Sequence, residues 1–237
     1  MPRLKHVPAG FDLAEALAGI RIDRASAIAP QVYRALRQRI VDGRLPAGTP
    51  IHENDIAGLC LVSRTPLRAA MQQLAGEGLV VTRPQVGSTV AGRDRARFLE
   101  ALFVRTAIES EIARRLASAG LDETALEPVL SRQEAAARRD DYATFFEADE
   151  EFHELLATMA RVPGAWQLVQ SVKAHVDRER YKLMSSIRGR SARAFGDHLA
   201  VLAAIREGDG ARASGLMAGH IESVLDEKLD QAKGSFD

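Results

Sequence analysis

Four ionisable residues, Asp149, His153, His198 and His220, stand where apolar core residues are expected. Each takes a place at three- or four-residue spacing in the apolar stripe of a predicted helix, so its side chain points inward. Burying an unpaired carboxylate among imidazoles is costly and favours a bound cation. Asp149 and His153 can bind one ion from the same helix, whereas His198 and His220 reach it only if a bundle brings three helices together. We therefore expect a metal or acidic-ligand site in a helical bundle. The alternative is three isolated core histidines.

Arg105 lies close to the apolar stripe of another predicted helix, between Leu102 and Ile108. An inward arginine requires a carboxylate, which either the protein or a ligand can supply. The two alternatives are an internal pair with Glu109 or Asp149 and the binding of an anionic ligand.

Arg64 and Arg68 form a second candidate site. They lie four residues apart on one face of a predicted helix, opposite its apolar face. An arginine side chain can bind O6 and N7 of guanine together, and the N-terminal end of a recognition helix is the part that reaches base edges. Ser63, Thr65 and the helix N-terminus can hold phosphate. A solvated basic face is the alternative for a lone pair of arginines.

The elements around these arginines predict a winged helix-turn-helix over residues 30–92. The pattern indicates a helix that ends at Asp42-Gly43, a short helix, a three-residue turn, a third helix, and two strands at 79–82 and 88–91. The strands are joined through Pro84 to Gly87, and Gly87 suits a wing tip because its backbone can approach a phosphate. Residues 1–29 are expected to form an N-terminal arm.

The remaining residues, 94–231, read as six amphipathic helices in an antiparallel bundle, so the predicted fold is mainly α. The expected helices cover 94–118, 122–139, 141–160, 164–187, 190–207 and 209–231. This all-helical domain carries the candidate metal or acidic-ligand site.

Charge is divided unevenly although the whole chain has a net charge of zero. Residues 1–92 hold 11 Lys and Arg against 7 Asp and Glu, and the rest holds 21 against 25. The excess of basic residues in residues 1–92 indicates that only this part of the chain binds a polyanion. The single cysteine, Cys60, excludes an intrachain disulfide and fits a reducing cytoplasm. No apolar run is long enough to cross a membrane, so no membrane partner is expected.

Three motifs between Tyr33 and Ala91 carry a resemblance to a known family. They read Ile40-Val41-Asp42-Gly43-Arg44-Leu45-Pro46-Ala47-Gly48, then Glu53-x-x-Ile56-Ala57, then Val62-Ser63-Arg64-Thr65-Pro66-Leu67-Arg68-x-Ala70-Met71-x-x-Leu74-x-x-x-Gly78-Leu79-Val80. This region resembles the DNA-binding domain of GntR-family transcription regulators. Residues 94–230 resemble, with less specific motifs, the FCD-class ligand domain of the FadR-type subfamily.

The resemblance implies roles for the residues selected above. Arg64, Thr65 and Arg68 correspond to the residues that read the operator. Asp149-Glu150-Glu151-Phe152-His153, with His198 and His220, matches the ligand set of metal-binding members, and an Arg at position 105 looks like the group that holds an organic-acid effector. The implied cofactor is one divalent ion, with zinc, nickel or manganese the most plausible.

Three positions depart from the family pattern. Leu61 stands where the helix-turn-helix usually has Gly, and Asn54 stands where some relatives have a DNA-contacting Arg. Residues 161–165 replace a Ser-Gly-Asn turn, which removes any ligand contact from that Asn.

Two competing functions are a metal-dependent enzyme and a bare metal-binding helical bundle. Glu150-x-x-His153 matches half of a di-iron motif, but no second Glu-x-x-His is present. Ala157 stands where a zinc protease needs its second His. We therefore predict a homodimeric, DNA-binding transcription regulator, a repressor rather than an enzyme. A small organic acid bound at the metal site is expected to control its affinity for a double-stranded operator.

Overall fold

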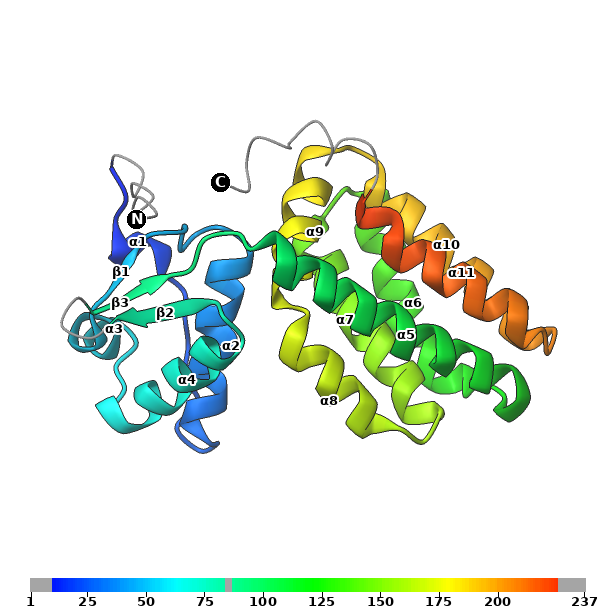
Figure 1. Cartoon of the computed structure of the whole chain (residues 1–237), viewed down its shortest axis with the longest axis horizontal. Coiled ribbons are helices and arrows are strands. Elements are labelled where there is room, and N and C mark those ends of the chain that lie inside the picture. Colours follow the sequence, from blue (N-terminus) through cyan, green and yellow to red (C-terminus); the bar gives the residue numbers. More distant parts are fainter. Residues whose placement is uncertain (1–9, 84–86, 226–237) are drawn as a thin grey trace. The chain divides into compact units, whose positions relative to one another are not determined.

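A computed structural model describes residues 10–83 and 87–225 of the chain. The chain divides into two compact units, residues 1–94 and 95–237 (Figure 1). In the predicted N-terminal arm, residues 1–9 lie outside the described part, and the short helix α1 (Leu13–Ala16) follows. None of the described helices is long and apolar enough to span a membrane.

The first unit has the predicted order of a winged helix-turn-helix. Its further elements are α2 (Ile28–Val41), β1 (Pro50–Ile51), α3 (Glu53–Leu59), α4 (Arg64–Gly76), β2 (Val80–Arg83) and β3 (Gly87–Val90). The α2 helix buries Val32, Leu36 and Ile40, each 1% exposed, at the spacing that the sequence indicated. The predicted inward side chains of α4 are likewise all buried: Leu67, Ala70, Met71 and Leu74.

The three strands form one antiparallel sheet in the order β1-β3-β2. Thr89 of β3 lies opposite Pro50 on one side and Val81 on the other. The sequence analysis missed β1, because a strand of two residues leaves no alternating pattern to detect. In the predicted wing, residues 84–86 lie outside the described part of the chain.

The second unit is helical throughout its described residues, which confirms the mainly α fold. Its elements are α5 (Arg95–Ala119), α6 (Glu123–Arg138), α7 (Tyr142–Met159), α8 (Pro163–Val172), α9 (Ala174–Ser186), α10 (Arg190–Arg206), α11 (Gly210–Glu222) and a 3₁₀ turn (Ser223–Leu225). The predicted last helix extended to residue 231, and residues 226–231 lie outside the described part.

Aspartate caps start three of these helices. The carboxylates of Asp122, Asp141 and Asp209 accept hydrogen bonds from backbone N–H groups in the first turns of α6, α7 and α11. Such a cap satisfies a donor that has no partner within the helix and places negative charge at the positive end of the helix dipole. Local sequence therefore determines where α6, α7 and α11 begin.

The predicted helix 164–187 is two helices, α8 and α9, which meet at Lys173. Lys173 is fully buried, and its Nζ donates to Glu150 and to both oxygens of Asp177. The sequence between Gly164 and Ile187 has no Gly or Pro to mark this junction. The junction is associated with a buried ion pair, which periodicity does not reveal.

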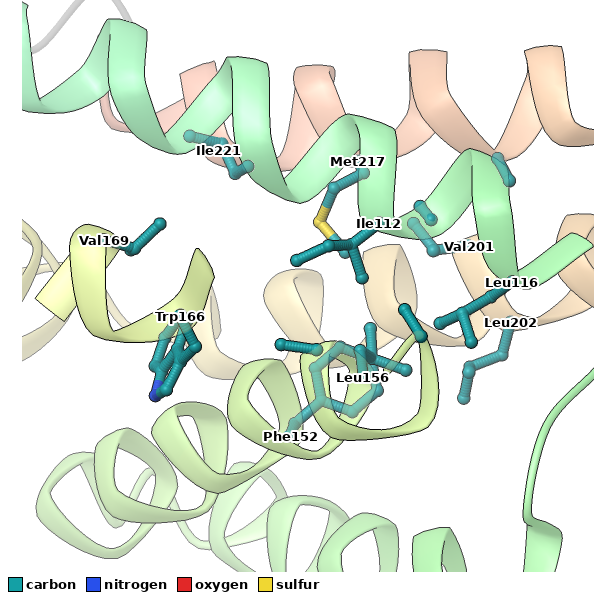
Figure 2. Packing of buried hydrophobic residues seen from close by; sticks show 14 of the residues in the cluster. Ile112, Leu116, Phe152, Leu156, Trp166, Val169, Val201, Leu202, Met217 and Ile221 are labelled. Carbon is teal, nitrogen blue, oxygen red and sulfur yellow. The ribbon is translucent and has the colours of Figure 1, made fainter. Parts of the chain in front are cut away.

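The core of the second unit is built from side chains of all seven α-helices, α5 to α11. Figure 2 shows side chains from several helices pointing into this interior, including Ile112 of α5, Phe152 of α7 and Met217 of α11. The helices α5, α10 and α11 pack side by side (Figure 1). The candidate metal ligands lie on α7, α10 and α11, the helices that bring these side chains together.

Leu61, in the turn between α3 and α4, has a left-handed backbone with φ of 54°. The sequence analysis noted that Gly is usual at this position. A β-carbon in this conformation crowds the neighbouring carbonyl oxygen, and the Leu61 side chain is 75% exposed, so packing offers little compensation. The turn is therefore strained at this residue.

We predict that Leu61→Gly raises the free energy of unfolding by about 0.5–1 kcal/mol, since relief of strain exceeds the entropy that Gly adds to the unfolded chain. The matched control is Leu59→Gly. Leu59 is 44% exposed and is the last residue of α3, two residues earlier, so its replacement should lower the free energy of unfolding by about 0.5 kcal/mol. Urea unfolding monitored by circular dichroism measures both changes. Destabilisation of similar size by both substitutions would contradict the account.

Candidate metal centre and nucleic-acid interface

The structure brings the four predicted ligands together from α7, α10 and α11. One ligand atom from each of Asp149, His153, His198 and His220 lies within 4.8 Å of the others. The closest pair is His198 Nε2 and His220 Nε2, 3.2 Å apart. Asp149 Oδ1 lies 3.5 Å from His198 Nε2 and 3.9 Å from His153 Nε2. All four residues are buried, so the prediction that they share one interior location is confirmed.

Each histidine directs its other ring nitrogen, Nδ1, to an oxygen atom. His198 Nδ1 lies 2.9 Å from Gln133 Oε1, His153 Nδ1 lies 2.7 Å from Glu109 Oε2, and His220 Nδ1 lies 3.4 Å from Asp197 Oδ2. The Gln133 amide is oriented because its Nε2 donates to the backbone oxygen of Ala148. Such an oxygen can accept a hydrogen bond from Nδ1–H, in the tautomer that leaves the lone pair of Nε2 free for a metal ion. The sequence analysis missed Gln133 in this role.

The donor set fits a divalent metal ion. Metal–nitrogen bonds of roughly 2.0–2.1 Å place neighbouring ligand atoms roughly 3.0–3.4 Å apart, and the His198–His220 separation is 3.2 Å. His153 Nε2 is buried and has no hydrogen-bond partner among the described residues. A buried polar atom normally has a partner, and a metal ion would provide one here. Three imidazoles and a carboxylate suit zinc and other transition ions.

The electrostatics favour the metal-binding forms of Asp149, His198 and His220. Burial lowers the pKa of His198 well below its ordinary value, with His220 adding to the decrease, and burial also lowers the pKa of His220. Burial alone would raise the pKa of Asp149, but Arg180 and the histidines outweigh it and hold that pKa far below its usual range. Neutral imidazole and ionised carboxylate are the ligand forms.

Arg180 of α9 is a component of the site that the sequence analysis missed. One of its terminal nitrogens lies 2.8 Å from each carboxylate oxygen of Asp149. The other terminal nitrogen, NH1, is buried and has no hydrogen-bond partner within the described residues. Arg180 lies four residues after Val176 and three before Leu183, both buried, so the spacing rule that identified the histidines also applied here.

Arg105 forms the internal pair that the sequence analysis held as the alternative. Its Nε donates to Glu109 Oε1 at 2.7 Å, and Glu109 also faces His153. Burial opposes ionisation of Glu109, yet Arg105 and His153 hold the pKa of its carboxyl well below the ordinary value. Arg105 thus supports the carboxylate that orients a candidate metal ligand.

A small cavity opens beside the cluster. Its lining includes four arginines, Arg105, Arg180, Arg190 and Arg193, together with His220. The cavity volume is about 20 Å³, which is room for roughly one water molecule.

The predicted DNA-reading residues lie at the start of α4. Arg64 and Arg68 are exposed, and Arg68 Nε donates to Glu53 Oε2 of α3 at 2.9 Å. Ser63 is the N-cap residue of α4, and its side chain makes no capping hydrogen bond there. Thr65 is exposed, and Gly87 of β3 has φ of 104°, a conformation that favours Gly. These side chains have the chemistry and exposure that a DNA interface requires.

Two family models match the chain. Residues 28–90 match the model described as bacterial regulatory proteins of the gntR family, and residues 100–223 match the FCD domain. Both are domains of transcriptional regulators and not of enzymes, which sets aside the metalloenzyme alternative.

Similar proteins include the HTH-type transcriptional repressor RspR of Escherichia coli, 35% identical over 82% of this chain and 86% of that protein. The gluconate operon transcriptional repressor of Bacillus subtilis is 31% identical over 53% of this chain and 52% of its own length. Among solved structures, E. coli McbR/YncC has a TM-score of 0.74 at 16% identity, over 86% of this chain and 98% of that chain. A GntR regulator from Rhodococcus sp. RHA1 has a TM-score of 0.70 at 21% identity, over 90% of this chain and 100% of that chain. The two structures share the fold.

We predict that Arg180→Met lowers the free energy of unfolding of the metal-free protein by about 3–5 kcal/mol, because it leaves the buried Asp149 carboxylate without a cation. Adding Asp149→Asn should recover part of that loss, because both members of the ion pair are then removed. The expected coupling free energy between the two substitutions is roughly 0.5–3 kcal/mol. Denaturant unfolding of both single variants and the double variant measures this coupling. Arg138→Met is the control, because Arg138 forms an exposed pair with Glu134. Additive losses would contradict the assignment.

Proposed function

Because the chain belongs to the GntR family of bacterial transcription regulators and carries an FCD domain, we propose that it is a repressor controlled by metal and effector. In this proposal the winged helix-turn-helix binds a double-stranded DNA operator. The helical unit binds one divalent ion and a small organic acid. The single observation that carries the proposal is the convergence of three histidine Nε2 atoms and the Asp149 carboxylate on one buried point.

Recognition of DNA is assigned to the start of α4. Arg64 and Arg68 would contact base edges, while Ser63, Thr65 and the backbone at Gly87 would hold phosphates. The ion pair with Glu53 supports this role for Arg68, because it limits the orientations of the guanidinium group before DNA arrives. Asn54, next to Glu53, offers an amide where some relatives have an arginine, so its contribution to binding would be uncharged.

Repression and dimerisation are supported by the relatives and by geometry. RspR and the gluconate operon protein are both named repressors. One winged helix-turn-helix reads few base pairs, and a two-fold dimer on a palindromic operator doubles the contacts. We therefore propose that the protein acts as a homodimer.

The metal would be held by Asp149, His153, His198 and His220. Bound there, it would supply a positive charge and open coordination positions for oxygen atoms of the effector. Zinc, nickel and manganese are the candidate ions, because imidazole nitrogen suits the first two and carboxylate suits the third. The acceptors at Nδ1 of each histidine support this assignment, since they orient the rings as in known metal sites.

The effector would be an anion, because the cavity beside the cluster is lined with arginines. Arg180 NH1 is buried without a partner and is suited to hold a carboxylate. We retain Arg105 as an effector-binding residue, since it also lines the cavity, although its pair with Glu109 leaves it fewer free donors. A cavity of about 20 Å³ is too small for an organic acid, so arginine side chains must move when the effector binds.

Control of DNA binding follows from that movement. A ligand shifts a conformational equilibrium only by its difference in affinity for the two states. When a cation neutralises Asp149, Arg180 is released and can turn toward the effector, which favours a different packing of α9. That change would alter operator affinity in the dimer by a coupling free energy of about 1–3 kcal/mol.

The metal assignment predicts that wild-type protein binds one divalent ion per chain and that His198→Ala and His220→Ala bind it at least about 10-fold more weakly, because each loses a ligand. Calorimetric titration of chelator-treated protein with Zn²⁺ measures this difference. The control is His52→Ala, since His52 is exposed in the first unit and should leave metal binding unchanged. Equal affinity in all four proteins would mean that the cluster is only a group of core histidines.

The DNA assignment predicts that Arg68→Ala weakens binding by about 1–3 kcal/mol. The probe is a duplex selected from a random library by the wild-type protein, with binding measured by fluorescence anisotropy. The slope of log affinity against log salt should be on the order of −5 to −10 for the dimer. Arg138→Ala, which removes an exposed arginine with a similar glutamate partner, should bind like wild type. Wild-type affinity in the Arg64→Ala/Arg68→Ala double variant would overturn the assignment.

A further inference from the structure

One face of α5 carries an exposed ridge whose members lie four residues apart. The ridge consists of Arg95, Leu99, Phe103, Ala107 and Glu111, all exposed. Phe103 is 75% exposed and Leu99 is 42% exposed, although α5 is otherwise a core helix of its unit. Residues spaced by four lie in one row on a helix surface and pack as a unit against another helix.

The ridge is complementary to itself when a second copy is turned through two-fold symmetry about Phe103. Four residues to either side are Leu99 and Ala107, a large and a small side chain. Eight residues to either side are Arg95 and Glu111, which carry opposite charges. Each of these lies roughly 12 Å from Phe103 along the helix axis, in opposite directions.

We propose that this ridge is the centre of the interface of the homodimer, with α5 of the two copies antiparallel. This inference rests on the dimer that the proposed function requires, and it names the surface. Phe103 then meets the partner's Phe103 on the two-fold axis, and Leu99 packs over the partner's Ala107. Arg95 of each copy lies beside the partner's Glu111, so a single surface patch satisfies both sides of an isologous interface.

The chemistry of the ridge favours a second copy over an unrelated partner. An exposed Phe and Leu alone would suit any apolar surface. Antiparallel packing of the ridge against the same ridge of a second copy requires opposite charges at equal distances on either side of the central Phe. Binding to an unrelated partner does not require this. Glu111 pairs with Arg114 of its own helix at the surface, and both side chains are 57% exposed, so they remain accessible to a partner. In the chain, α5 begins five residues after β3 ends, so the interface lies close in sequence to the winged domain.

Cysteine cross-linking tests the two-fold axis directly. Phe103→Cys should form a disulfide-linked dimer under mild oxidation, because a residue on the axis faces its own copy and cysteine Cα atoms must approach within roughly 7 Å. Leu99→Cys alone should not cross-link, whereas Leu99→Cys/Ala107→Cys should. Two controls accompany these variants: wild type, whose Cys60 is buried, and Leu168→Cys on α8, where Leu168 is 62% exposed. Cross-linking of Leu168→Cys and Phe103→Cys at the same rate would overturn the proposal.

Charge reversal gives a second test, read by sedimentation equilibrium. Arg95→Glu and Glu111→Arg should each raise the dimer dissociation constant about 10-fold, and the double reversal should return it to within about 2-fold of wild type. No recovery in the double variant would overturn this interface. If Phe103→Arg remains as dimeric as wild type, the interface is wrong while the dimer stands. A wild-type chain that sediments as a monomer at micromolar concentration would overturn both the interface and the proposed dimer.

Discussion

The carboxylate of Asp149 is fully buried, and its charge requires a cation inside the second unit. A buried ionised carboxylate is unstable unless it is paired and hydrogen-bonded. Arg180 provides this pairing from α9, with one nitrogen 2.8 Å from both oxygens. The Nε2 atoms of His198 and His153 lie 3.5 Å and 3.9 Å from the same group, and His220 belongs to the same cluster. Two kinds of cation, a guanidinium group and a metal ion, can therefore compensate one charge.

In the proposed function, this arrangement would let the helical unit respond to ligands. An arginine that leaves Asp149 must find another anion, and the nearest open space is the cavity lined by Arg105, Arg190 and Arg193. An anionic effector would meet that need. Since Arg180 belongs to α9 and the metal ligands belong to α7, α10 and α11, the proposed exchange of partners would change the forces between these helices. Such a change can move a packed bundle between two discrete arrangements.

The sequence predicted the fold and the cluster because both depend on periodic patterns. Inward spacing placed Asp149 and three histidines on core faces, and the structure joins them at one point. The partners of these groups were harder to predict. Gln133 reaches His198 across 65 positions in the chain, and no local pattern links them. Arg105 had Glu109, Asp149 and an anionic ligand as candidate partners, and the fold pairs it with Glu109. The break at Lys173 and the strand β1 were missed because neither has a local signal.

A crystal structure of zinc-loaded protein, with anomalous data at the zinc edge, tests the central claim most directly. The account predicts one anomalous peak per chain, roughly 2.0–2.2 Å from Nε2 of His153, His198 and His220 and from a carboxylate oxygen of Asp149. In that structure Arg180 should have left Asp149. A peak bound through Nδ1 atoms, a peak at another location, or Arg180 still bound to both oxygens of Asp149 would contradict the account.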